Sequence, residues 1–201
     1  MAEEGKYLPE IEKCDISSVK GSVIVKDFSK EKFKMNLKSN KVNVIKILPG
    51  GVVTAKDTAE IELDANGEFV RNPEVDLVKV AVVERHQGTG NVACGFLKGY
   101  GIKEGAVALS VAHDSHNIIV VGVNDEEMEF AVNSLVEQEG GIVLVKEGKV
   151  IESMPMPIAG LMSDQSGEWV DQKLTDIHEK AYEELGTVSY THLTLPTKRI
   201  V

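Results

Sequence analysis

The alternation of apolar and polar residues predicts a series of short strands in the first half of the chain. Three segments have the pattern of half-buried strands: residues 42–48 (VNVIKIL), 52–53 (VV) and 59–63 (AEIEL). Three sequences typical of turns follow them: PGG at residues 49–51, NG at 66–67 and RNPE at 71–74. Residues 11–40 are mostly polar, with one short apolar run at residues 23–25.

The centre of the chain is more apolar and predicts three further strands. These are residues 77–84 (LVKVAVVE), 105–113 (GAVALSVAH) and 117–123 (NIIVVGV). The last segment is an almost continuous apolar run, whereas a strand with one face in water would alternate. We therefore expect it to be covered on both faces.

A helix is expected directly after this buried strand. Apolar residues recur at helical spacing at positions 128, 131, 132, 135 and 136. Asn124 is placed to cap the helix, and Glu127 to close a capping box. The glycines at 140–141 would stop it, and residues 142–155 predict a hairpin that turns at 147–148. The order strand, helix, strand predicts a crossover within one sheet.

A second helix is predicted over residues 168–185, with Asp164 or Ser166 as its cap. Its buried stripe would be formed by Val170, Leu174, Ile177, Ala181 and Leu185. The fold class that follows is α/β or α+β, with a mixed β-sheet covered by at least two helices.

Composition and charge narrow the class of protein. The chain has 201 residues, of which 42% are hydrophobic and 27% charged, which is typical of a globular domain. No apolar run reaches the ~20 residues of a membrane span, and the acidic N-terminus lacks a secretory pattern. With 32 acidic and 22 basic residues, the net charge of −10 argues against a nucleic-acid partner. Six lysines between residues 26 and 41 are interleaved with acids, so they are expected to form a solvated face.

The two cysteines predict neither a metal site nor a disulfide framework. Cys14 and Cys94 lack the spacing of metal ligands, and Cys94 in its apolar context is expected to be a small buried residue rather than a nucleophile. The cytoplasm is therefore the expected compartment. No membrane partner is expected either.

The last residues differ in composition from the rest of the chain. Residues 187–197 read TVSYTHLTLPT, which resembles the in-frame translation of a transposon-based sequencing adapter. We therefore expect residues 187–201 to be a read-through artefact and exclude them from fold reasoning. An ordinary C-terminal strand is the alternative interpretation.

Three clusters of polar residues follow apolar strands, where α/β folds gather binding groups. The first, residues 84–91 (ERHQGTGN), contains Arg85 and His86. Its glycines at 88 and 90 would allow backbone N–H groups to form an anion-binding nest. The alternative is a tight turn in which Arg85 and His86 make only local hydrogen bonds.

The second cluster, residues 111–117 (VAHDSHN), is denser. His113, Asp114 and His116 would present imidazole and carboxylate groups that bind a heterocycle or transfer protons. The alternative is a polar turn in which Asp114 accepts backbone N–H bonds. A metal ion held by the two histidines would need a further ligand, and none lies close in sequence.

The third cluster, residues 157–164 (PIAGLMSD), is expected to have a structural role. With prolines at 155 and 157 it is typical of a rigid extended segment that leads into a helix cap. Met154, Met156 and Met162 are expected to fill gaps in the core rather than to bind a cofactor.

Taken in order, several segments resemble the C-terminal domain of bacterial adenine deaminases, which belong to the amidohydrolase superfamily. The segments are VAVVERHQGTGNVACGFLKGYGIKEGA, SVAHDSHNIIVVGVNDEEM, AVNSLVEQEGGIVLV and MPIAGLMSD. By this resemblance residues 11–186 form that C-terminal domain, and residues 1–10 are the remnant of the small β-domain that accompanies the catalytic barrel. Gln87 departs from the family, which often has His or Lys there.

The resemblance implies an enzyme that converts adenine and water into hypoxanthine and ammonia. In that family a divalent metal, manganese or iron, sits in a (β/α)8 barrel whose ligands include an H-x-H pair, and this chain contains no H-x-H. We therefore expect no metal on this chain, which would be inactive alone. The implied partners are adenine, the missing barrel and further copies in a homo-oligomer.

The same resemblance leads to a hypothesis about the site. Arg85, His86, His113, Asp114 and His116 would line a surface that faces the barrel mouth or a subunit interface and would help to exclude water. Two alternatives stay open at this point. The chain could be a free-standing binding module of the same fold, or an independent metalloenzyme that uses His113 and His116.

Overall fold

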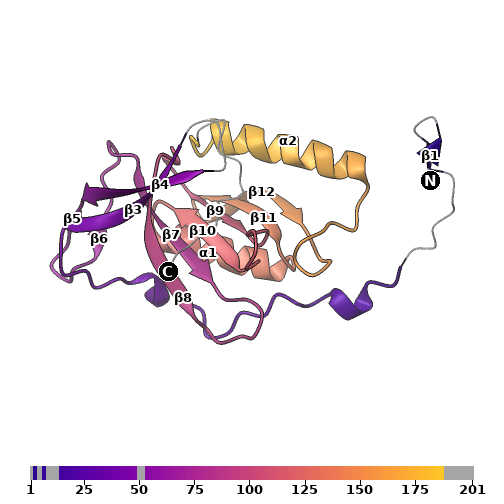
Figure 1. The fold of residues 1–201 in the computed structure, drawn as a ribbon, viewed down its shortest axis with the longest axis horizontal. Coiled ribbons are helices and arrows are strands. Elements are labelled where there is room, and N and C mark those ends of the chain that lie inside the picture. The colour runs from indigo at the N-terminus through magenta and orange to yellow at the C-terminus, as the bar shows by residue number, and fades with distance from the viewer. Residues whose placement is uncertain (1, 4–5, 8–13, 49–52, 188–201) are drawn as a thin grey trace.

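The computed structural model describes residues 2–3, 6–7, 14–48 and 53–187. Within these residues, the central element is a mixed sheet of eight strands in the spatial order β12-β11-β9-β10-β7-β8-β3-β4 (Figure 1). Its strands in chain order are β3 (Lys41–Ile47), β4 (Thr54–Glu60), β7 (Leu77–Val83), β8 (Val92–Lys98), β9 (Ala106–Leu109), β10 (Ile118–Gly122), β11 (Gly141–Lys146) and β12 (Lys149–Pro155). This confirms the predicted fold class.

Most neighbours in this sheet are antiparallel. The exception is the pair β3 and β8, which runs parallel at the register Ile45↔Leu97. Two small hairpins complete the strands: β1 (Ala2–Glu3) with β2 (Lys6–Tyr7), and β5 (Glu62–Leu63) with β6 (Phe69–Val70). Two short 3-10 helices, η1 (Ser17–Val19) and η2 (Lys30–Phe33), lie in the otherwise extended segment before β3.

Helix α1 (Asp125–Glu137) connects β10 to β11, and both strands are antiparallel to β9 between them. The two strands are therefore parallel to each other, which confirms the strand–helix–strand crossover. The Asn124 side chain accepts the Glu127 N–H at 2.8 Å, as predicted. Glu127 does not close the capping box, because its carboxylate instead accepts the backbone N–H of Gly148 at 3.0 Å in the β11–β12 turn.

Helix α2 (Gly167–Glu183) begins at Ser166, whose hydroxyl accepts the Trp169 N–H at 3.3 Å. Of the two predicted caps, Ser166 is therefore the correct one. The predicted stripe faces the sheet: its C-terminal members are fully buried, and Val170 and Leu174 pack at its margin. In the described part of the chain no helix combines the length and the apolar character needed to cross a membrane.

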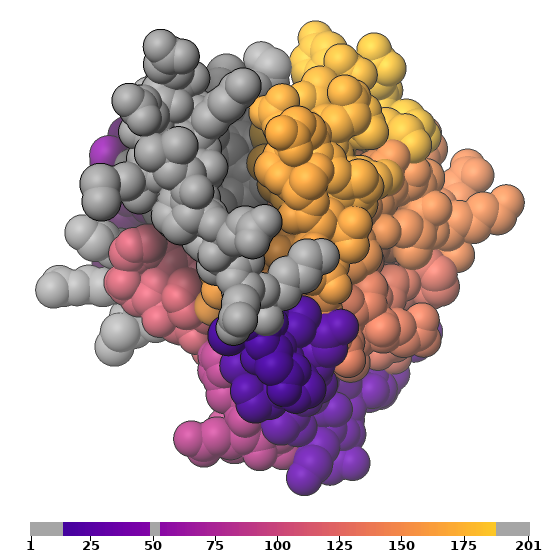
Figure 2. Space-filling model, turned by 90° about the vertical axis from the view of Figure 1, so that its right-hand side faces the viewer, coloured from indigo at the N-terminus to yellow at the C-terminus, as the bar shows by residue number. Residues whose placement is uncertain are grey.

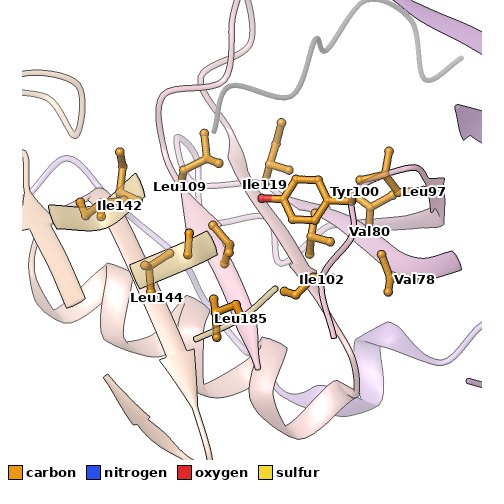
Figure 3. Close-up of a cluster of buried hydrophobic side chains, with 14 of the residues drawn as sticks. Val78, Val80, Leu97, Tyr100, Ile102, Leu109, Ile119, Ile142, Leu144 and Leu185 are labelled. Atoms are coloured by element: carbon orange, nitrogen blue, oxygen red, sulfur yellow. The ribbon is translucent and has the colours of Figure 1, made fainter. Parts of the chain in front are cut away.

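The two helices cover opposite faces of the sheet, so the core has two layers. Along β10, Ile119 and Val121 face α2, whereas Ile118 and Val120 face α1. Figure 3 shows side chains of the first layer, among them Tyr100 beside Ile119 and Leu185 between Leu144 and Ile102. All five residues of β10 are buried, which confirms that this apolar run is covered on both sides.

Several sequence predictions about strands were incomplete. Strand β8 was missed, because Gly95 and small residues interrupt its apolar pattern. Most of β4 was also missed, since this edge strand (TAKDTAE) carries few apolar residues, and Val53 lies before it with 62% of its surface exposed. Strand β9 ends at Leu109 rather than 113, because the chain turns there into the loop that contains the histidines. The turn at 49–51 lies outside the described residues.

Candidate functional site

The three polar clusters come together at one end of the sheet, although sequence alone placed them in separate loops. The 84–91 turn follows β7, the 110–117 loop joins β9 to β10, and the 156–166 segment joins β12 to α2. The register pairs Val83 with Ile118 and Leu109 with Ile142, so these loops all leave the sheet at the same end of its strands.

An N-terminal segment crosses the same end of the sheet. The Ala159 N–H donates to the Val19 carbonyl at 3.1 Å, and the Ile24 N–H donates to the Arg85 carbonyl at 2.8 Å. In Figure 2 the indigo N-terminal residues lie against the orange residues of the segment that precedes α2. We call residues 19–24, 84–91, 112–117 and 158–164 together the loop end.

Arg85 joins the segments of the loop end to one another. Its side chain is buried, with 1% of the residue exposed. Nε donates to the carbonyl of His116, and Nη1 donates to the carbonyl of Ala159 at 3.1 Å. Burial lowers the pKa of this guanidinium. Arg85 therefore acts as a cross-link between all three clusters, which is a structural role that the sequence did not predict.

The close approach to Arg85 requires a glycine in the third cluster. Gly160 has φ +70°, and a Cβ atom there would lie 2.6 Å from Arg85 Nη1. Its carbonyl accepts the hydroxyl of the buried Ser110, which in turn accepts the Gly141 N–H at 2.7 Å. The glycine in PIAGLMSD thus has a packing reason, and Ser110 ties the loop end to the start of β11.

The backbone N–H groups of the first cluster hold a side chain of the same turn. The Glu84 carboxylate accepts the backbone N–H groups of His86, Gln87 and Thr89 at 2.5–2.9 Å. Hydrogen bonds from Thr89, Gln87 and His86 outweigh partial burial and lower the pKa of Glu84 to about 2. Because the carboxylate is ionised at neutral pH, the nest is closed to an external anion.

The imidazoles of the site differ in their surroundings. His86 is exposed, and its Nε2 lies 2.8 Å from the Ser115 carbonyl, so the first two clusters touch. His113 is 78% exposed in its side chain, and its Nδ1 lies 2.9 Å from Asp114 Oδ1. Asp114 thus pairs with an imidazole, whereas the alternative interpretation expected it to accept backbone N–H bonds.

His116 is more constrained than the other two histidines. Its φ of +49° is unusual for a side chain of this size, and its carbonyl is held by Arg85. The His116 Nδ1 atom is buried and has no hydrogen-bond partner among the described residues. Such strain at a non-glycine residue is often found where a site needs a fixed geometry.

The side chains of His113 and Asp114 are 78% and 73% exposed, so both groups face the solvent in this domain. A pocket of about 440 Å³ lies between η2, β6 and the start of α1, and none of the five candidate residues lines it. Two of the cations that line it are paired within the chain, Lys30 with Glu126 at 2.9 Å and Lys79 with Asp125 at 2.7 Å.

A metal ion does not fit the residues at hand. In the described ranges no three His, Cys, Asp or Glu side chains come close enough to hold one. Cys94 is half-buried, and burial raises the pKa of its thiol to about 11, so it is poorly suited to act as a nucleophile. Met154 is buried as predicted, but Met162 is 58% exposed, so the core assignment of Met162 was wrong.

Comparison of the chain with known proteins shows to which family it belongs. The profile of the adenine deaminase C-terminal domain matches residues 51–197. The chain is 63% identical over 186 residues to adenine deaminase 2 of Desulfotalea psychrophila, a match that covers 92% of this chain and 32% of the relative. The adenine deaminase of Ligilactobacillus salivarius is 45% identical over 186 residues, which again cover 92% of this chain and 32% of the relative. That of Bacillus subtilis is 45% identical over 76% of this chain and 26% of its own length. The chain thus spans about a third of the relatives it matches.

Proposed function

Because this chain belongs to the adenine deaminase C-terminal domain family, we propose that it works as the C-terminal part of an adenine deaminase. The intact enzyme would convert adenine and water into hypoxanthine and ammonia. The similarity to relatives that carry this name, over 92% of the chain in two cases, is the observation that supports the proposal.

The catalytic metal of this proposal belongs to residues outside the chain. No described residues of the chain are grouped as metal ligands. From the family resemblance, we propose that a divalent metal, manganese or iron, is held in the part of the intact enzyme that precedes this domain. Alone, this domain would be inactive. The proposal also includes a cytoplasmic location and a homo-oligomeric enzyme.

For the domain itself, we propose that its polar loop residues help to close the active site or form a subunit interface. Arg85 fixes the positions of His116 and Ala159, and His86 contacts the 112–117 loop, so the imidazoles are held on one surface. A surface whose groups are already fixed loses little conformational entropy when it packs against another domain.

The experiment is a chimaera in which this chain replaces the matching third of the Desulfotalea psychrophila relative. Adenine deaminase activity of the chimaera, and its absence from the chain alone, are the expected results. We expect His113→Ala and His116→Ala to lower kcat/KM or to change the oligomeric state. His178→Ala, an exposed histidine on α2, is the matched control and should change neither.

Two outcomes would contradict the proposal. An inactive but well-folded chimaera with its metal bound would contradict the enzymatic assignment and favour a free-standing binding module. Unchanged kcat/KM and unchanged oligomeric state for both loop variants would remove the histidines from the functional surface while leaving the enzymatic assignment intact.

A further inference from the structure

The loop end carries an exposed apolar side chain on a turn that cannot move freely. Met162 is 58% exposed. Its backbone is locked to Ile158 by two hydrogen bonds of 3.1 Å, one in each direction. Ala159 inside this turn has φ +57° and is held from both sides, by Val19 through its N–H and by Arg85 through its carbonyl.

A large apolar side chain on a turn whose backbone is already hydrogen-bonded is suited to anchor a protein partner. Burying a methionine side chain against a partner removes its apolar surface from water, which favours association. The turn would lose little conformational entropy on binding a partner, because its backbone hydrogen bonds are already made. Ile24, also on the loop end, adds a second apolar side chain that is 40% exposed.

The identity of the partner follows from the family and from the path of the chain. The matched relatives have about two thirds of their length outside the matched part, which is named a C-terminal domain. The described chain reaches the domain at this end, where Val19 bonds to Ala159 and Lys20 lies 3.9 Å from Asp164. A domain that precedes this one in the intact enzyme would be tethered near the loop end, which would raise its effective concentration there.

We propose that the loop end is the docking surface for the domain that precedes this one in the same polypeptide, with Met162 as its apolar anchor. The exposed imidazoles of His86 and His113 form the polar rim around this anchor. This inference rests on the proposed function, since only the intact enzyme contains the partner.

The test compares the chimaera with the 201-residue chain by amide hydrogen exchange. Docking is expected to slow exchange at residues 112–117 and 158–164 about tenfold or more in the chimaera. Met162→Glu should abolish this protection in the chimaera, because a carboxylate would have to be desolvated at the contact. Tyr182→Glu, on α2 and equally exposed at 58%, should leave it unchanged.

The two proposals fail in different ways. Protection confined to β12 or to the outer surface of α2 would overturn the docking inference even if the chimaera deaminates adenine. Protection of the loop end that depends on protein concentration in the 201-residue chain would show that a second copy is the occupant, which also overturns it. An inactive chimaera with a protected loop end would leave docking intact and contradict only the enzymatic assignment.

Discussion

At the scale of single residues, Arg85 is the most deeply buried charged residue in the described part of the chain. Among the described residues, its guanidinium donates to the backbone carbonyls of His116 and Ala159 rather than to a carboxylate. Carbonyl oxygens can satisfy a guanidinium because its five N–H donors point in fixed, divergent directions. The charged group therefore holds the loops in fixed positions.

Replacing Arg85 tests this role. We expect Arg85→Met to lower the free energy of unfolding by about 3 kcal/mol, since it leaves buried carbonyls without donors. Arg85→Lys should recover only part of the loss, because one ammonium group cannot reproduce the fork that spans His116 and Ala159. Urea unfolding followed by the fluorescence of Trp169, the single tryptophan, measures both. A cost below about 0.5 kcal/mol for Arg85→Met would contradict the cross-link.

At the scale of elements, helix α2 is joined to the edge strand β12 by more than apolar packing. Glu152 on β12 has only 13% of its side chain exposed and accepts hydrogen bonds from Lys173 at 2.6 Å and Lys180 at 2.9 Å. Burial alone would raise the pKa of Glu152, but the bonds from Lys173 and Lys180 outweigh burial and lower the pKa to about 2.

This pair of contacts predicts a pH dependence. A carboxyl whose pKa is lower in the folded state contributes stability above its unfolded pKa, near 4.5, and loses it as pH falls towards 2. We expect wild-type unfolding free energy to fall over that range. In Glu152→Gln the fall should be smaller by about 2 kcal/mol. Urea titrations at pH 5, 4 and 3 measure it, and identical slopes for both proteins would exclude this role of Glu152.

The start and end of β11 provide a second test at this scale. Gly141 has φ +107°, and a Cβ atom there would lie 1.9 Å from the Met154 carbonyl oxygen. Gly148, just after the strand, has φ +67° and open space around it. Gly141→Ala is expected to cost more than about 4 kcal/mol or to prevent folding, whereas Gly148→Ala should cost only about 1–2 kcal/mol of backbone strain. Thermal unfolding compares them, and equal costs would show that the backbone contact at Gly141 relaxes.

At the scale of the whole molecule, the boundary near residue 187 stays a prediction. The last described residue, Thr187, is buried and donates its N–H to Ala181 at 3.1 Å. The family match extends to residue 197, whereas the sequence suggested an artefact from residue 187 onwards.

Deletion of residues 188–201 separates these interpretations. If the segment is a read-through artefact, chains of 187 and 201 residues should unfold at the same urea concentration with the same slope. A loss of more than about 1 kcal/mol on deletion would show that the segment packs as part of the domain.

The sequence by itself determined the features that depend on near neighbours. The buried strand at residues 118–122, the Asn124 cap and the turn at 147–148 follow from periodicity and local hydrogen bonding, which act over a few residues. It also identified the family. Strand β8 was not predicted because its apolar pattern is weak. Its extended conformation depends on pairing with β3 and β7.

Only the tertiary structure decided what the polar clusters do. Glu84 closes the nest within its own turn, but Arg85 bonds to carbonyls 31 and 74 residues away. Every residue offers a backbone carbonyl, so the identity of such partners leaves no mark in the sequence. The exposure of Met162 was hidden for a related reason: whether an apolar side chain faces the core or the solvent depends on how its turn is held, and this turn is held by Arg85 and Val19.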